Sequence, residues 1–192
     1  MRQEDIIIVS GLPRSGTSLM MQLLQAGGIP LVCDDKRAAD NFNPRGYFEY
    51  EAVKGLATDN SWVEQGQGKA LKVLYHLLKA LPETLRYKVI FMQRPLNEVM
   101  QSQDRMLAGL GREDIAPANA DLAMTFAQQT DDVLRWAEKQ EHMELWQCDY
   151  PQLIENPTHT LQELAHFLGT ELPLETLKQS IEPNLYRIHS NA

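Results

Sequence analysis

The sequence predicts an α/β layer fold with a mainly parallel central sheet. Short apolar, strand-like runs alternate along the chain with stretches of helical periodicity. The strongest strand-like run leads directly into a glycine-rich loop and then a helix. With 192 residues, 43% of them apolar, the chain has the size of one globular domain. We therefore expect residues 1–192 to fold as a single unit.

The first two elements enclose the glycine-rich loop. Residues 5–10 are apolar and β-branched, which predicts a fully buried strand. Residues 17–26 have helical spacing, with four apolar side chains on one side: Leu19, Met20, Leu23 and Leu24. Gly27 and Gly28 then end the helix. A loop between a buried strand and a helix is the setting in which a phosphate-binding loop is found.

The later elements repeat the alternation. Strands are predicted at residues 70–73, more weakly, and at 88–92 and 143–147. Helices are predicted from Pro95 to about Leu110, over 118–139, and from Pro157 to Leu168, where Gly169 ends the last one.

Four residues capable of binding a ligand follow predicted strands. They are Arg14, Lys72, Arg94 and Tyr150. In a parallel α/β sheet, ligands bind beyond the carboxyl ends of the strands. We therefore expect these residues to converge at one edge of the sheet.

Composition excludes several classes of protein. The net charge is −8 and the basic residues are scattered, which argues against general nucleic-acid or heparin binding. The longest apolar runs are strand-sized, so no membrane span or signal peptide is predicted. Two cysteines, Cys33 and Cys148, indicate neither a disulfide framework nor a metal site. These features favour a reduced, cytoplasmic compartment.

The segment GLPRSGTS, residues 11–18, has the G-x-x-x-x-G spacing of a P-loop, but Thr17 replaces the usual lysine. The backbone N–H groups of residues 14–18 and the helix N-terminus are suited to one phosphate. Thr17 and Ser18 add hydroxyl donors, and Arg14 adds a forked cation. The loop is poorly suited to ATP chemistry without its lysine. The plainer alternative is an ordinary turn before a helix.

PRSGTS resembles the 5′-phosphosulfate loop of sulfotransferases, P-[KR]-S-G-T-[ST]. The resemblance implies a P-loop NTPase-like three-layer α/β fold. It also implies transfer of a sulfuryl group from 3′-phosphoadenosine 5′-phosphosulfate (PAPS) to an acceptor hydroxyl or amine, without a metal. The implied donor-binding residues in this segment are Arg14, Ser15, Gly16, Thr17 and Ser18.

Further motifs extend the resemblance. Arg94 and, eight positions later, Ser102 match the pair that holds the 3′-phosphate in that family. Tyr150 stands where the family often has Y-E-D-L, close to the adenine, and residues 43–49, NPRGYFE, resemble a segment of many bacterial members. The family's C-terminal R-K-G type motif is missing, and Arg187 is the candidate for a late contact to the 3′-phosphate.

The catalytic groups follow from the same resemblance. Arg14 is expected to stabilise the leaving 5′-phosphate and Lys72 to lie near the sulfuryl group. Two adjacent carboxylates can raise one pKa, so Asp35 is the first candidate for the general base and Asp34 the second. Glu49 is a further candidate, whereas His76 has the surroundings of a structural histidine.

Two other functions remain open from the sequence. One is a P-loop kinase or NTPase, with Asp149 in place of a Walker-B acid. The other is a catalytically inactive nucleotide-binding relative. If the chain is a sulfotransferase, the absence of a basic stripe favours a small neutral or apolar alcohol, phenol or amine as acceptor. The sequence does not indicate an oligomeric state.

Overall fold

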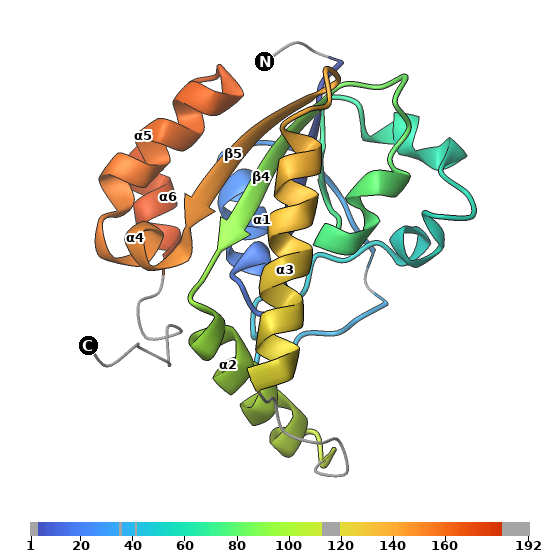
Figure 1. The fold of residues 1–192 in the computed structure, drawn as a ribbon. Coiled ribbons are helices and arrows are strands. Elements are labelled where there is room, and N and C mark those ends of the chain that lie inside the picture. Colours follow the sequence, from blue (N-terminus) through green and yellow to red (C-terminus); the bar gives the residue numbers. More distant parts are fainter. Residues whose placement is uncertain (1–3, 35, 41, 113–119, 182–192) are drawn as a thin grey trace.

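The protein has a parallel β-sheet at its centre (Figure 1). The structure is a computed structural model that describes residues 4–34, 36–40, 42–112 and 120–181. These residues form a five-stranded sheet in the order β2-β3-β1-β4-β5, and each neighbouring pair is parallel. The strands are β1 (Ile6–Gly11), β2 (Leu31–Val32), β3 (Ala70–Lys72), β4 (Tyr87–Gln93) and β5 (Met143–Asp149).

Helices cover both faces of the sheet and make the fold three layers thick (Figure 1). One face is covered by α1 (Thr17–Ala26), α4 (Tyr150–Glu155), α5 (Pro157–Leu168) and α6 (Leu174–Ser180). The other is covered by α3 (Ala120–Ala137) and three 3-10 helices, η1 (Glu51–Gly55), η2 (Ser61–Gly66) and η3 (Tyr75–Ala80). Helix α2 (Leu96–Gly109) continues from β4 and packs against α3. None of the helices in these described segments combines the length and apolar character that a bilayer crossing needs.

Strand β1 is the centre of both hydrophobic layers. All six of its residues are buried. Because successive side chains of a strand point to opposite faces, Ile6 and Ile8 pack under the 3-10 helices while Ile7 and Val9 pack under α1. The glycine-rich loop therefore leaves the sheet from its most constrained strand.

The predicted α/β architecture with a parallel sheet is confirmed. The predicted long helix is present as α3, although residues 118 and 119 lie outside the described residues and the helix ends at Ala137. Strand β2 and helices α4 and α6 were not predicted. They are two, six and seven residues long, too short to show a clear period in the sequence.

Replacing a core residue of β1 should destabilise the fold strongly. The Ile8 side chain has no exposed surface, so Ile8→Ala should lower the free energy of unfolding by about 2–5 kcal/mol through lost burial and a cavity. Urea denaturation measures the change. Met124→Ala, at a side chain that is 71% exposed, is the control and should change stability by less than about 0.5 kcal/mol. Equal effects of the two substitutions would contradict the central place given to β1.

Candidate functional site

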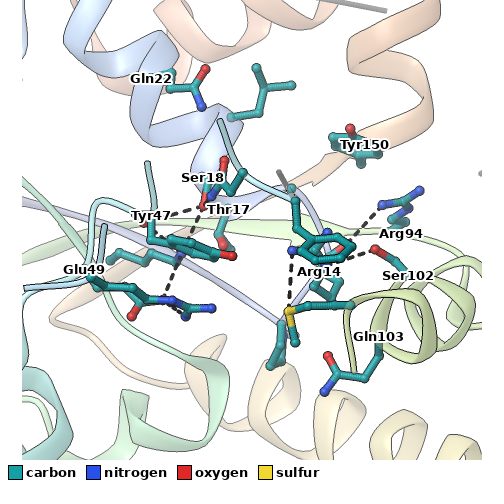
Figure 2. Close-up of a pocket in the computed structure, with 18 of the residues that line it drawn as sticks. Arg14, Thr17, Ser18, Gln22, Tyr47, Glu49, Arg94, Ser102, Gln103 and Tyr150 are labelled. Carbon is teal, nitrogen blue, oxygen red and sulfur yellow. Dashed lines mark hydrogen bonds and ion pairs between the residues drawn. The ribbon is translucent and has the colours of Figure 1, made fainter. Parts of the chain in front are cut away.

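A cavity of about 440 Å³ opens at the carboxyl edge of the sheet (Figure 2). The four residues expected to converge there, Arg14, Lys72, Arg94 and Tyr150, all line it. Other walls come from the first turns of α1, from α2, and from the segment we call the cavity loop, residues 36–40 and 42–49. Figure 2 shows Glu49 and Tyr47 on one side of the cavity and Arg94, Ser102 and Tyr150 on the other.

The turn between β1 and α1 depends on positive backbone φ angles. They occur at Gly11 (140°), Arg14 (70°) and Gly16 (102°). Gly16 is also fixed by packing, because a Cβ atom at this position would collide with the ring of Tyr150. The turn leads into α1, whose first N–H groups have no acceptor within the helix and lie at the cavity that Gly16, Thr17 and Ser18 line.

Ser15 supports this turn from the inside. Its hydroxyl donates to the Leu12 carbonyl at 2.7 Å and its backbone N–H donates to the same oxygen at 3.2 Å. Gly16, Thr17 and Ser18 line the cavity, whereas Ser15 is buried beneath them. Both donors of Ser15 therefore stabilise the loop in this structure, and its role in ligand binding stays a prediction.

Arg14 extends from the loop across to α2. Its Nε donates to the Ser102 hydroxyl at 2.9 Å, and one terminal nitrogen lies 4.0 Å from the Met106 sulfur. Burial lowers the pKa of the Arg14 guanidinium, and the charge of Arg94 acts in the same direction. An arginine nevertheless stays protonated at neutral pH, so Arg14 places a fixed positive charge inside the cavity.

Contacts from several directions hold Arg94 at the end of β4. Its Nε donates to Glu98 at 2.9 Å, and a terminal nitrogen donates to the Arg14 carbonyl at 3.1 Å. The guanidinium carbon also lies 4.8 Å from the centre of the Tyr150 ring. Glu98 is only 1% exposed, so this ion pair is buried. The contacts fix Arg94 beside Arg14, at the end of the cavity that Ser102 also lines.

Lys72 occupies the opposite part of the cavity at the end of β3. Its ammonium donates to the Tyr47 carbonyl at 3.0 Å and to the Ser18 hydroxyl at 3.2 Å. The Lys72 ammonium also lies 3.7 Å from a carboxylate oxygen of Glu49. Burial lowers the pKa of Lys72 to about 8, and the positive charge of Arg37 contributes, whereas Glu49 opposes the change.

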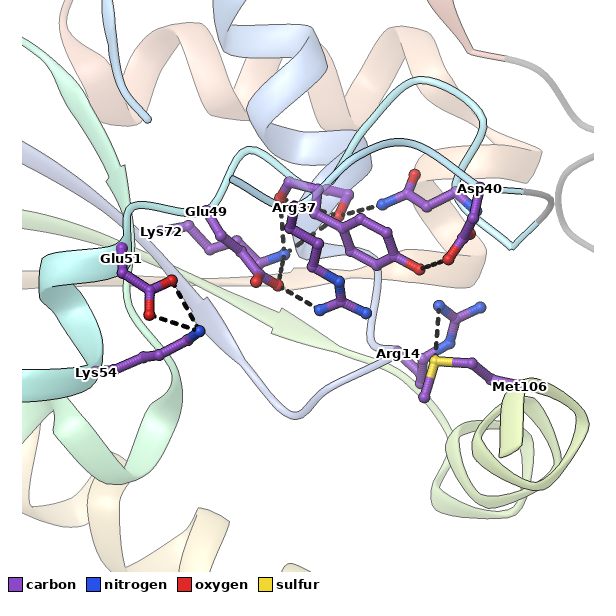
Figure 3. Close-up of polar contacts among 11 residues, drawn as sticks. Arg14, Arg37, Asp40, Glu49, Glu51, Lys54, Lys72 and Met106 are labelled. Atoms are coloured by element: carbon purple, nitrogen blue, oxygen red, sulfur yellow. Dashed lines mark hydrogen bonds and ion pairs between the residues drawn. The ribbon is translucent and has the colours of Figure 1, made fainter. Parts of the chain in front are cut away.

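Glu49 joins Lys72 to the cavity loop (Figure 3). Its carboxylate accepts from an Arg37 nitrogen at 2.8 Å, and the Arg37 guanidinium stacks 3.4 Å from the centre of the Tyr47 ring. Both Arg37 and Glu49 line the cavity. Sequence reasoning ranked Glu49 third among the bases, although Glu49 ends the NPRGYFE segment that pointed to this region.

Comparison with known families identifies the chain at this point. The model of the sulfotransferase domain family matches residues 3–187. The chain belongs to the sulfotransferase family. Membership confirms the resemblance seen in PRSGTS and argues against the alternative of a P-loop kinase or NTPase. A comparison with curated proteins gives no significant match.

Solved sulfotransferase structures have the same fold. The domain from the Synechococcus PCC 7002 olefin synthase has a TM-score of 0.56 at 17% identity, covering 93% of this chain and 77% of that one. STF1 from Mycobacterium tuberculosis gives 0.55 at 16% identity, with 92% and 70% covered. Mouse SULT7A1, solved in complex with PAP, gives 0.53 at 16% identity, with 100% and 68% covered. The three-layer α/β fold of the sulfotransferases is thereby confirmed.

Other predicted site residues in this sulfotransferase have different surroundings. The Asp34 carboxylate accepts backbone N–H groups of Glu51 at 2.8 Å and Lys36 at 3.1 Å. These hydrogen bonds lower the Asp34 pKa, so the expected rise is wrong for this carboxylate. Asp34 also lies outside the set of described residues that line the cavity. Asp35 and Arg187 lie outside the described residues.

Two residues considered for other functions have structural contacts. Asp149 caps α4 by accepting the Gln152 N–H at 2.8 Å, which accounts for its place at the end of β5. His76 is exposed and packs edge-on against Tyr75, away from the residues that line the cavity. Among the described residues, no group of three or more His, Cys, Asp or Glu side chains is arranged to hold a metal ion.

The low pKa of Lys72 should be visible in the pH dependence of stability. Between pH 8 and about 10.5 the unfolded chain binds a proton at Lys72 that the folded chain has released, so stability should rise with pH across this window. Relative to Lys72→Met, the wild type should gain on the order of 3 kcal/mol from pH 7.5 to 10.5. Urea denaturation at several pH values measures this difference. Parallel curves for the two proteins would show that the Lys72 pKa is ordinary.

Proposed function

We propose that this sulfotransferase transfers a sulfuryl group from PAPS to the hydroxyl or amine of a small-molecule acceptor, releasing 3′-phosphoadenosine 5′-phosphate (PAP). The observation that supports this most is the shared cavity of the lysine-free phosphate loop and the Arg94–Ser102 pair. It offers binding groups for two separate phosphates, as a 3′,5′-bisphosphate requires. The presence of PAP in the mouse relative supports the same donor.

The 5′-phosphate is assigned to the loop. In this proposal the N–H groups of Gly16 and Thr17 at the start of α1, the hydroxyls of Thr17 and Ser18, and the Arg14 guanidinium bind it. Gly16, Thr17 and Ser18 line one cavity, and Arg14 is a forked donor already held in it. This set suits one phosphate better than a triphosphate with its metal.

The 3′-phosphate is assigned to Arg94 and Ser102. Arg94 is pre-oriented by Glu98, so little side-chain entropy is lost when it binds an anion. Tyr150 is proposed to contact the adenine because its ring lines the same end of the cavity. The role of Arg187 stays a prediction from the sequence.

The chemical step is an in-line displacement at sulfur. The acceptor oxygen or nitrogen forms a bond to sulfur while the bond from sulfur to the 5′-phosphate oxygen breaks. The bonding electrons leave with the phosphate, where Arg14 and Lys72 offset the developing negative charge. The acceptor proton passes to a general base. Positive side chains supply the charge stabilisation, so the proposal includes no metal.

We place Glu49 in the role of this base. It lines the cavity, lies 3.7 Å from Lys72, and is oriented by Arg37. Asp35, the first choice from the sequence, has no described position, and Asp34 is committed to backbone hydrogen bonds. Apolar residues that line the cavity favour a small neutral or apolar acceptor: Phe42, Leu74 and Met106.

Nucleotide binding tests the donor assignment. Wild-type protein should bind PAP without Mg²⁺, and its affinity for PAP should exceed that for 5′-AMP by about 10–100-fold. One or two charge-assisted hydrogen bonds to the 3′-phosphate contribute this much. Arg94→Gln combined with Glu98→Gln should remove this preference while sparing 5′-AMP binding. The double change is needed because Arg94→Ala alone would deprive the buried Glu98 carboxylate of its cationic partner.

Isothermal calorimetry measures these affinities. Glu98→Gln alone controls for the second substitution, and Arg135→Gln, at an exposed ion pair, controls for loss of a positive charge. Tighter binding of Mg-ATP than of PAP would overturn the proposal.

Activity tests the proposed base. Glu49→Gln keeps the size of the side chain but removes its capacity to accept a proton, so turnover should fall by about 10²–10⁴-fold while PAP affinity changes little. Sulfuryl transfer from labelled PAPS to a panel of phenols, alcohols and amines gives the measurement. Glu51→Gln, two positions away and paired with Lys54 at the surface, is the matched control. Full turnover in Glu49→Gln would show that another group is the general base. If wild-type protein binds PAP but transfers no sulfuryl group, the protein is a catalytically inactive relative.

A further inference from the structure

The Ser18 hydroxyl is surrounded by donors. Asn43 donates its side-chain N–H to the Ser18 oxygen at 2.8 Å, and the Lys72 ammonium donates to the same oxygen at 3.2 Å. A serine oxygen has two lone pairs and one hydrogen, so these contacts occupy both lone pairs. The hydrogen is left for an acceptor, and the Tyr47 carbonyl at 3.5 Å is at the outer limit for this. That carbonyl already accepts from Lys72 at 3.0 Å.

Asn43 is itself held firmly by Asp40. Its backbone N–H donates to the Asp40 carbonyl at 3.1 Å and to an Asp40 carboxylate oxygen at 2.9 Å. The other carboxylate oxygen accepts the Tyr47 hydroxyl at 2.7 Å. Burial raises the Asp40 pKa, but hydrogen bonds from Tyr47, Phe42 and Asn43 outweigh it and the pKa is lowered, so Asp40 stays ionised. The Asn43 side chain thus projects toward α1 from a fixed turn.

We propose that Asn43 is a positioning residue for the sulfuryl donor. Together with Lys72 it occupies the lone pairs of Ser18, so that the Ser18 hydrogen points to the 5′-phosphate. The inference rests on the proposed function, because it assigns the 5′-phosphate to the loop. It extends that function by tying the anion site to the cavity loop, which carries Arg37 and Glu49 (Figure 3) and Tyr47 (Figure 2).

Two substitutions of Asn43 that differ in charge should weaken ligand binding to different extents. Asn43→Ala removes the donor and frees a Ser18 lone pair, so the hydroxyl loses its preferred orientation. Asn43→Asp has the same size and retains the turn, but its carboxylate would accept the Ser18 hydrogen and place a negative charge beside the phosphate. The second change should therefore be the more harmful to binding of a 5′-phosphate.

The test measures Kd values for PAP and for adenosine 3′-monophosphate, which has no 5′-phosphate. Asn43→Ala should weaken PAP about 10-fold, as expected for one hydrogen bond to a charged group, and Asn43→Asp should weaken it at least about 30-fold. Binding of adenosine 3′-monophosphate should stay within about twofold, which also shows that the variants are folded. Asn60→Ala, which removes an exposed asparagine bonded to the Ala80 carbonyl, should leave both ligands unaffected.

A double-mutant cycle with Ser18→Ala separates an indirect role from a direct one. If Asn43 acts through Ser18, Asn43→Ala should cost less than about twofold when Ser18 is already alanine. An equal cost in both backgrounds, or PAP affinity unchanged in Asn43→Asp, would overturn the inference and leave the proposed function standing. Failure of wild-type protein to bind PAP would overturn both.

Discussion

The site depends on one backbone constraint, the reversal of the chain between β1 and α1. Strand β1 is buried on both faces, and the chain leaves it at the carboxyl edge of the sheet. The reversal needs positive φ at Gly11, Arg14 and Gly16, and Tyr150 packs where a Gly16 side chain would be. The reversal leaves the first N–H groups of α1 without a helical acceptor. It also directs the Arg14 side chain to the Ser102 hydroxyl, and the Arg14 carbonyl accepts a hydrogen bond from the Arg94 side chain. Packing in the sheet thereby determines where positive charge lies in the cavity.

Local electrostatics reconciles the acidic chain with the strongly anionic donor proposed for it. The net charge is −8, yet Arg14, Arg94 and Lys72 gather in one cavity. Glu98 holds Arg94 within the protein interior, and Glu49 lies close to Lys72. With a pKa of about 8, Lys72 is close to losing its proton at physiological pH, and an anion nearby would favour the charged form. The attraction is local, as expected for a focused site.

Local patterns predicted the layers of this protein and the edge where the site lies. Buried β-branched runs and helical periods identified β1, β4, β5, α1 and α5, and the rule for parallel sheets brought Arg14 and Lys72 into one cavity. The direction of individual side chains was not predictable. The Ser15 side chain points inward because its hydroxyl donates to the Leu12 carbonyl, and Asp34 accepts the backbone N–H of Glu51 from 17 positions further along the chain. The sequence of the cavity loop has no hydrophobic period from which to predict it, because contacts between side chains fix its conformation.

The way the cavity loop is attached has a consequence for altering the acceptor side of the proposed site. Side-chain contacts hold it in place, among them Asp40 with Tyr47, Asn43 with Ser18, and Arg37 with Glu49. Its segments 36–40 and 42–49 add no strand to the sheet, although Phe48 packs against the core that contains Ile7 and Val9. An exchange of the loop sequence is therefore expected to leave the sheet intact, but to keep the proposed donor site only where Asn43 and its contact with Ser18 are retained. With Asn43 and Glu49 retained, the acceptor side of the proposed site can be altered on an unchanged sheet.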